Sequence, residues 1–116
     1  MAVYSKQLLS GSVNGKGIKI TGTTPSGTTI HTSITGTTSF DEIWLYATNT
    51  YASPVILTIE WGSPTAPDDN IIQTLQLQNG LVLIISGLLL NNALIVKAYA
   101  SVANVVVIHG YVNRIV

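Results

Sequence analysis

Apolar and polar residues alternate along this chain in short runs that are typical of β-strands. In segment 42–49, Ile43 and Leu45 would face one side of a strand, and Trp44 and Tyr46 would face the other. Gly, Pro, Asn and Ser residues separate these runs, and no segment shows the apolar spacing of an amphipathic helix. The pattern therefore predicts an all-β protein.

Nine segments follow this pattern, at spacings of about 8 to 14 residues. The predicted strands are residues 3–9, 17–21, 28–35, 42–49, 55–61, 71–77, 81–86, 93–100 and 104–113. The clearest loops between them are GTTPSG at 22–27 and GSPTAPDDN at 62–70, which contain Pro and Gly where turns need them. Many short strands at this spacing predict an antiparallel β-sandwich of about eight or nine strands with a jelly-roll-like topology. We expect residues 17–116 to form this single domain, and residues 1–16 to form an N-terminal extended arm or an edge strand.

The most apolar stretch, LVLIISGLLLNNALIVKAYA at 81–100, is too interrupted to predict a membrane span. Crossing the hydrocarbon core takes about 20 consecutive apolar residues. Here Gly87 breaks the run, and Asn91 and Asn92 would place two amides inside the bilayer. We interpret these three residues as turn residues between strands, and we expect no membrane partner. The N-terminus also lacks an apolar segment of signal-peptide length, so export by that route is not expected.

Several predicted strands are apolar on both faces. Leu94, Val96 and Ala98 would point one way, while Ile95 and Tyr99 would point the other. A two-layer sandwich normally buries only one face of each strand against its core. The second face therefore needs another cover, which could be a second copy of the chain, its own N-terminal arm or a different protein. This pattern favours a protein that works in an assembly.

The composition points the same way. Only 9% of the residues are Asp, Glu, Lys or Arg, against about 25% in an ordinary globular chain, and the formal net charge is zero. The few basic residues are scattered, so we expect no patch for nucleic-acid phosphates. The absence of cysteine excludes disulfides and thiolate metal sites. Low charge combined with 47% hydrophobic residues favours association.

Candidates for catalysis or metal binding are few. His31 and His109 lie in predicted strands, where we interpret them as hydrogen-bonded strand residues rather than general bases. Asp41 and Glu42 are adjacent on a strand, so their side chains would point to opposite faces. The Asp pair at 68–69 is interpreted as part of a turn rather than as a cation site. We therefore expect no enzyme activity, no cofactor and no metal.

The aromatic residues leave two alternatives open. A stacking platform for sugar rings could be built from the larger ones, Trp44, Tyr46, Tyr51, Trp61 and Tyr99. Packing in the core and at interfaces would use the same residue types. Trp61 shares a predicted face with Leu57 and Ile59 and is assigned to the core, whereas Trp44 and Tyr46 are assigned to a contact surface.

The strings FDEIWLYATNT at 40–50, SPVILTIEWG at 53–62 and NVVVIHGYVNRIV at 104–116 resemble segments of the capsid decoration or cement proteins of tailed bacteriophages. The resemblance runs from about Tyr4 to the C-terminus and includes the Pro-Asp-Asp loop. It implies a compact β-sandwich or jelly-roll domain without catalytic residues, made in the host cytoplasm and located on the exterior of the virion capsid. It also implies a homo-oligomer, with a trimer slightly favoured over a dimer, that clamps neighbouring subunits of the major capsid protein.

We expect the N-terminal arm and two of the strands to contact other subunits or the capsid. The predicted contact residues are Tyr4, Leu8, Leu9, Trp44, Tyr46, Ile95 and Tyr99. The alternative function is a carbohydrate- or receptor-binding β-sandwich module of a phage fibre or tail, because such proteins are built in the same β style.

Overall fold

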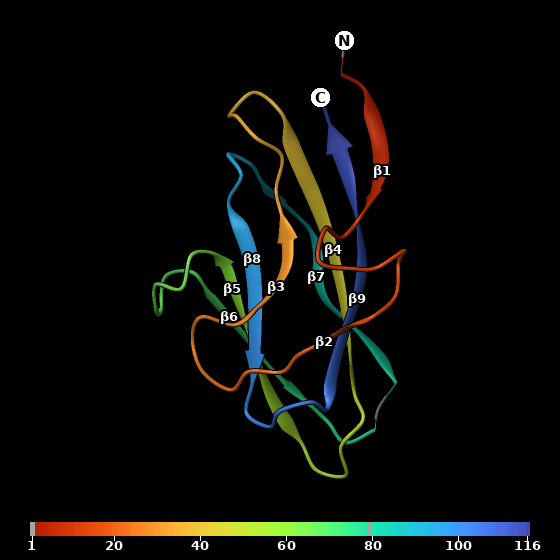
Figure 1. Cartoon of the computed structure of the whole chain (residues 1–116), viewed down its shortest axis with the longest axis vertical. Coiled ribbons are helices and arrows are strands. Elements are labelled where there is room, and N and C mark those ends of the chain that lie inside the picture. The colour runs from red at the N-terminus through yellow and green to blue at the C-terminus, as the bar shows by residue number, and fades with distance from the viewer. Residues whose placement is uncertain (1, 79) are drawn as a thin grey trace.

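The computed structural model describes residues 2–78 and 80–116, which form nine β-strands in two antiparallel sheets. The strands are β1 (Tyr4–Leu8), β2 (Ile18–Lys19), β3 (Thr28–Thr32), β4 (Phe40–Asn49), β5 (Val55–Gly62), β6 (Asn70–Leu75), β7 (Leu81–Leu90), β8 (Ile95–Ala100) and β9 (Val106–Ile115). Sheet A has the order β1-β9-β4-β7, with β2 also paired to β9, and sheet B has the order β3-β8-β5-β6. Figure 1 shows the two sheets facing each other along the long axis of the molecule. The predicted antiparallel β-sandwich is confirmed.

The strand pairing is nested from the two ends of the chain inward. β1 and β2 pair with β9, β3 pairs with β8, β4 with β7, and β5 with β6. The pairs β4–β9 and β5–β8 then complete the two sheets. A long two-stranded ribbon rolled up in this way is a jelly roll, so the predicted topology is confirmed as well.

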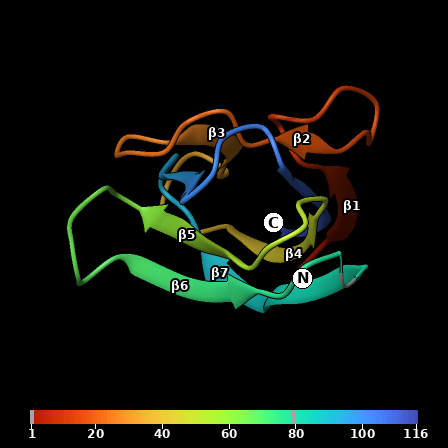
Figure 2. The same ribbon diagram turned by 90° about the horizontal axis from the view of Figure 1, so that it is seen from below.

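The core lies between the two sheets, which Figure 2 views along the long axis. It is built from alternate positions of the longer strands, because successive side chains of a strand point to opposite faces. Fully buried members include Ile43, Leu45 and Ala47 of β4, Leu57 and Ile59 of β5, Val96 and Ala98 of β8, and Ile108 and Val112 of β9. Trp61 is partly buried and packs against this cluster, as predicted.

The N-terminal segment is an edge strand of its own molecule. β1 pairs with β9 from Tyr4, opposite Ile115, to Leu8, opposite Tyr111. Val3 and Val116 exchange two backbone hydrogen bonds, and Figure 1 shows the two ends of the chain next to each other. Of the two alternatives for residues 1–16, the structure has the edge strand over Tyr4–Leu8; Met1 lies outside the described residues.

Strand β7 is longer than the predicted segment 81–86. Gly87, which the sequence suggested as a turn residue, lies inside the strand with a φ of 79°. The register with β4 shifts beside it, which is the signature of a β-bulge. A bulge with a left-handed glycine lets the strand continue to Leu90 instead of ending. The stretch 81–100 thus forms β7, a turn and β8, and no helix in the described residues is long and apolar enough to cross a membrane.

Strand β3 ends at Thr32, although the alternation predicted a strand over 28–35. The register with β8 shifts around Ile30, and Ile30 and His31 are both buried. A strictly alternating strand would place these two neighbouring residues on opposite faces, so the alternation of this segment does not hold. One bulged residue reverses the side of every later side chain, which a strict period of two cannot anticipate.

The other strand ends differ from the predictions by a few residues. β2 contains only Ile18–Lys19, and β6 ends at Leu75 rather than at Leu77. β8 starts at Ile95, so Leu94 lies outside the strand with its side chain exposed and does not share the buried face of Val96. The reason is the preceding turn, whose backbone leaves the extended conformation.

We expect the substitution Ala93→Gly to stabilise the protein. Asn92 and Ala93 form the turn between β7 and β8 with φ values of 61° and 57°, and the amide of Leu94 donates a hydrogen bond to the Asn91 carbonyl. Tight hairpin turns with two positive φ values strongly prefer Gly at the second position, because a Cβ is strained there. Urea unfolding should show a gain of about 0.5–1 kcal/mol.

The matched control is Ala52→Gly, in an exposed loop where φ is not positive. Ala52→Gly should lower the free energy of unfolding slightly, because glycine gives the unfolded chain more conformational freedom. Equal effects of the two substitutions would contradict the assignment of strain to Ala93.

Candidate functional site

The candidate functional site is the outer face of sheet A. Along β4, Ile43 and Leu45 point into the core, so Glu42, Trp44 and Tyr46 point outward. Residues paired across antiparallel strands lie on the same face, so the register extends this surface across the sheet. The outer face of sheet A comprises Tyr4, Lys6 and Leu8 of β1, Lys19 of β2, Phe40, Glu42, Trp44, Tyr46 and Thr48 of β4, Leu81, Leu83, Ser86 and Leu89 of β7, and Val107, His109, Tyr111, Asn113 and Ile115 of β9.

An aromatic stack crosses the middle of this face. The rings of Trp44 and Tyr111 have centroids 6.1 Å apart and planes that differ by 9°. The ammonium of Lys6 lies 4.6 Å from the centroid of the Tyr111 ring. Because β1 and β4 flank β9 on opposite sides, Lys6 and Trp44 cover opposite faces of Tyr111. Cation–π and stacking contacts of this kind hold the side chains in one arrangement.

The bulge at Gly87 supports the other side of Trp44. A Cβ atom at Gly87 would lie 3.0 Å from Cζ2 of the indole, closer than most Cβ contacts, and the φ of 79° also favours glycine here. Glu42 fixes the edge of the indole, because its Oε1 accepts hydrogen bonds from Trp44 Nε1 at 2.9 Å and from Asn113 Nδ2 at 3.0 Å. These two hydrogen bonds lower the pKa of Glu42, and the one from Asn113 has the larger effect.

Around this stack, the outer face of sheet A exposes large apolar side chains. They are Tyr4, Leu8, Phe40, Leu81, Leu83 and Leu89. Leu88 is also exposed at the β7 edge of the same sheet. Soluble monomers rarely expose contiguous apolar surface on a large scale, and such patches usually mark contacts with other molecules.

The predicted contact residues fall in three places. Tyr4, Leu8, Trp44 and Tyr46 lie together on the outer face of sheet A. Ile95 and Tyr99 lie half-buried on the outer face of sheet B, and the structure does not bring them near the first group. Leu9 is buried in the core of its own molecule, with an exposed fraction of 2%, so its side chain is not available at the surface.

Sequence reasoning missed Tyr111 and the leucines of β7. Tyr111 was detectable, because it alternates with the apolar residues Val112 and Gly110 in the string HGYVNRI. Leu89 was missed because the predicted strand ended at residue 86. The two register shifts between β7 and β4 cancel, so Leu89 faces the same side as Leu81 and Leu83.

A buried polar cluster lies inside the sandwich behind this face. Asp41 is fully buried and accepts two hydrogen bonds from the Arg114 guanidinium, at 2.8 and 3.0 Å. Its Oδ2 also accepts hydrogen bonds from Nε2 of His31 at 2.8 Å and from the amide of Ile34 at 3.1 Å. Burial raises the pKa of Asp41, but the hydrogen bonds from Arg114 and His31 outweigh it and hold that pKa below its ordinary value. The hydrogen bond to Asp41 in turn raises the pKa of Arg114.

His31 is held by hydrogen bonds on both sides of its ring within this cluster. The Ser10 amide donates a hydrogen bond to Nδ1 of His31 at 3.0 Å, so the imidazole carries its proton on Nε2 and donates it to Asp41. Both ring nitrogens are therefore engaged, and His31 is a hydrogen-bonded strand residue, as predicted. Asp41 and Glu42 point to opposite faces, which confirms the prediction for that pair.

The loop with the other acidic pair has the predicted form of a turn. The hydroxyl of Ser63 donates a hydrogen bond to Oδ2 of Asp69, and the amide of Asp69 donates one to the carbonyl of Thr65. Both contacts close the loop on itself.

Comparison with known proteins provides no relative of this chain: no protein-family model, no curated protein and no solved structure matches it.

Proposed function

We propose that this protein is a structural component of a bacteriophage virion, an oligomeric cement protein on the outside of the capsid that clamps neighbouring capsid subunits. The observation that supports this role best is the outer face of sheet A. It combines an aromatic stack with exposed apolar side chains on three strands of the sheet, β1, β4 and β7. Surfaces that bind other proteins are enriched in aromatic anchors of this kind.

The physical demands of a cement protein agree with this surface. Such a protein acts through binding free energy alone, and many copies on one shell convert modest contacts into strong attachment. A face with few charges keeps its affinity at high ionic strength, because salt screens mainly exposed charges. A β-sandwich with locked side chains also loses little conformational entropy when it docks.

The carbohydrate-binding alternative loses support on this face. Tyr111 has both ring faces covered, by Lys6 and by Trp44, so no sugar can stack on it. Two of the residues proposed for an aromatic platform lie elsewhere, because Trp61 packs against the core and Tyr99 lies on the opposite sheet.

We expect the double substitution Leu81→Asp and Leu83→Asp to weaken both oligomer formation and capsid binding at least tenfold, since a contact here would bury unpaired carboxylates. Both side chains are exposed in the single chain, so the fold should tolerate the change. Light scattering gives the mass in solution, and co-sedimentation with phage heads that lack the protein gives the capsid affinity.

The matched control is Ile56→Asp with Ile72→Asp, which places the same two charges at exposed positions on the outer face of sheet B. It should leave mass and capsid binding unchanged. A wild-type protein that is monomeric at high concentration and does not bind heads would refute the proposed function, and equal losses in both double variants would refute the choice of face.

A further inference from the structure

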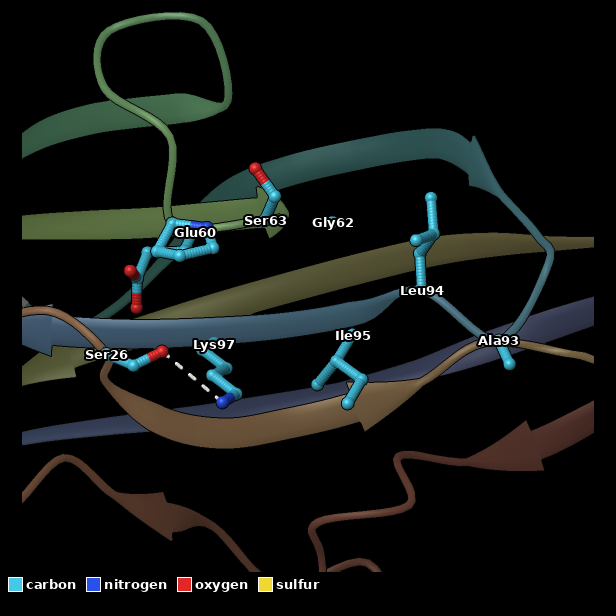
Figure 3. A pocket seen from close by; sticks show the side chains of 9 residues that line it. Ser26, Glu60, Gly62, Ser63, Ala93, Leu94, Ile95 and Lys97 are labelled. Carbon is cyan, nitrogen blue, oxygen red and sulfur yellow. Dashed lines mark hydrogen bonds between the residues drawn. The ribbon is translucent and has the colours of Figure 1, made fainter.

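A pocket of about 270 Å³ opens on the outer side of sheet B, between the β5–β6 loop, the turn before β8 and the loop at 22–27. Its polar groups come from Ser26, Glu60, Ser63 and Lys97, and Leu94 and Ile95 supply apolar walls. Figure 3 shows Ser26, Glu60 and Lys97 gathered at one end, and Leu94 at the other. This pocket is separate from the outer face of sheet A.

Glu60 is a buried carboxylate with one unused oxygen. The residue is only 1% exposed, although it points away from the core on the outer face of β5. Its Oε1 accepts a hydrogen bond from the amide of Gly27 at 2.6 Å. Within residues 2–78 and 80–116, Oε2 has no hydrogen-bond partner. A buried charged oxygen without a donor is unfavourable, so this atom is suited to accept a hydrogen bond from a ligand.

Lys97 faces Glu60 across the β5–β8 pair, but it does not neutralise it directly. Its ammonium donates a hydrogen bond to the Ser26 hydroxyl at 3.3 Å, which Figure 3 marks. The ion pair found in the described part of the chain is that of Asp41 with Arg114. The pocket thus offers one anionic acceptor and one cationic donor, held apart, whose charges sum to zero.

We propose that this pocket binds a small neutral polyol, specifically a single sugar ring. A sugar hydroxyl would donate to Oε2 of Glu60, and a neighbouring hydroxyl oxygen would accept from Lys97. The C–H surface of the ring would lie against Leu94 and Ile95. The summed charge favours neither a cation, which Lys97 repels, nor an anion, which Glu60 repels.

The size of the pocket sets the size of the ligand. Pockets for drug-sized ligands have volumes of roughly 300–1,000 Å³, so this one has room for one ring and not for a long oligosaccharide. The strained turn at Ala93 forms part of the rim, and strained backbone is often kept at binding sites. Sugar binding would add a second activity to the structural role proposed above, and it does not depend on that role.

The experiment is an NMR titration of the ¹⁵N-labelled protein with D-glucose, D-galactose, D-mannose and N-acetyl-D-glucosamine in the millimolar range. At least one sugar should shift the amide signals of Gly27, Glu60 and Lys97 in a saturable way. Glu60→Gln should weaken this binding about tenfold or more, because it removes a charged acceptor. Leu94→Trp, at an exposed rim position, should abolish it by filling the pocket.

The matched control is Asp68→Asn, which removes one carboxylate charge from the adjacent loop without touching the pocket lining. It should bind like the wild type. The proposal is overturned if no sugar shifts these signals, if Leu94→Trp binds as well as the wild type, or if guanidinium or methylammonium ions bind there instead. The titration uses the isolated protein, so its result is independent of the capsid-binding test. Sugar binding can be absent while capsid binding is present, and sugar binding can be present while capsid binding is absent.

Discussion

Asp41→Asn should lower the free energy of unfolding by about 3 kcal/mol, the lower end of the range for breaking a buried charge pair. Asp41 accepts hydrogen bonds from His31, Ile34 and Arg114 with both carboxylate oxygens. An asparagine has the same shape but only one oxygen. Whichever way its amide turns, its NH₂ group faces donors, and the guanidinium loses its charge partner. Denaturant unfolding measures the loss directly, and the melting temperature should fall by roughly 10 °C.

The neighbouring residue is a matched control for this prediction. Glu42→Gln removes the same charge from the same strand, but on the outer face, where water can solvate the groups left behind. It should have a much smaller effect. Losses of equal size in the two variants would show that the buried cluster does not stabilise the fold.

The cluster also predicts a pH dependence. The folded-state pKa of Asp41 lies below the unfolded value, which is near 3.9 for an ordinary Asp. Its contribution to stability is therefore fully present above about pH 4, and it is lost as the pH falls through the folded pKa. The stability difference between wild type and Asp41→Asn should be constant at neutral pH and shrink in acid. A difference that stays constant down to pH values well below the unfolded pKa would contradict the assigned direction.

Gly110→Ala should also lower the free energy of unfolding by about 3 kcal/mol or more, because no small movement can make room for the new methyl group. Gly110 lies in β9, opposite Leu45 of β4. A Cβ atom there would overlap the carbonyl oxygen of Trp44 and lie 3.3 Å from Cα of Leu45. These are backbone atoms of a strand that is paired on both sides, so the sheet itself must shift. The same shift would disturb the stack of Trp44 on Tyr111, which Trp fluorescence can report during denaturant unfolding.

Gly22→Ala is the matched control. The nearest atom to a Cβ at Gly22 would be the Thr24 carbonyl oxygen, at 4.0 Å. This substitution should change the stability by less than about 1 kcal/mol, and the reduced freedom of the unfolded chain favours a small gain. If Gly110→Ala is as harmless as Gly22→Ala, the close contact between β9 and β4 does not exist in solution.

The local alternation of the chain was enough to predict most of the fold. The faces predicted for β4 and β5 were correct, and in β8 only Leu94 was misplaced, since a strand of period two carries that information in its own sequence. The alternation failed in β3, where the bulge at Ile30 changes the register, and β7 was predicted too short, because its bulged Gly87 was interpreted as a turn residue. A bulge depends on the partner strand, so the period of one strand does not reveal it.

The candidate site was predicted only in part, for the same reason. Trp44 and Tyr46 could be assigned to an outward face from β4 alone. That Leu8 and Tyr111 lie on the same face follows from the order of the strands in sheet A, which brings β1 and β9 beside β4. The sequence alone did not show which of the two neighbouring leucines of the N-terminal segment is buried. In the structure, Leu8 is exposed and Leu9 is buried.

By itself, the sequence determined that this protein is an all-β sandwich with few charges and with more apolar strand faces than one core can bury. Alternation and composition are local properties, so they can be read without the fold. Only the tertiary structure decided which side chains meet. It joined Asp41 to Arg114, 73 positions away, and it enclosed Glu60 beside Lys97 in a pocket. Contacts of this kind depend on strand order, register and bulges, and these are set by the packing of the whole chain rather than by any one segment.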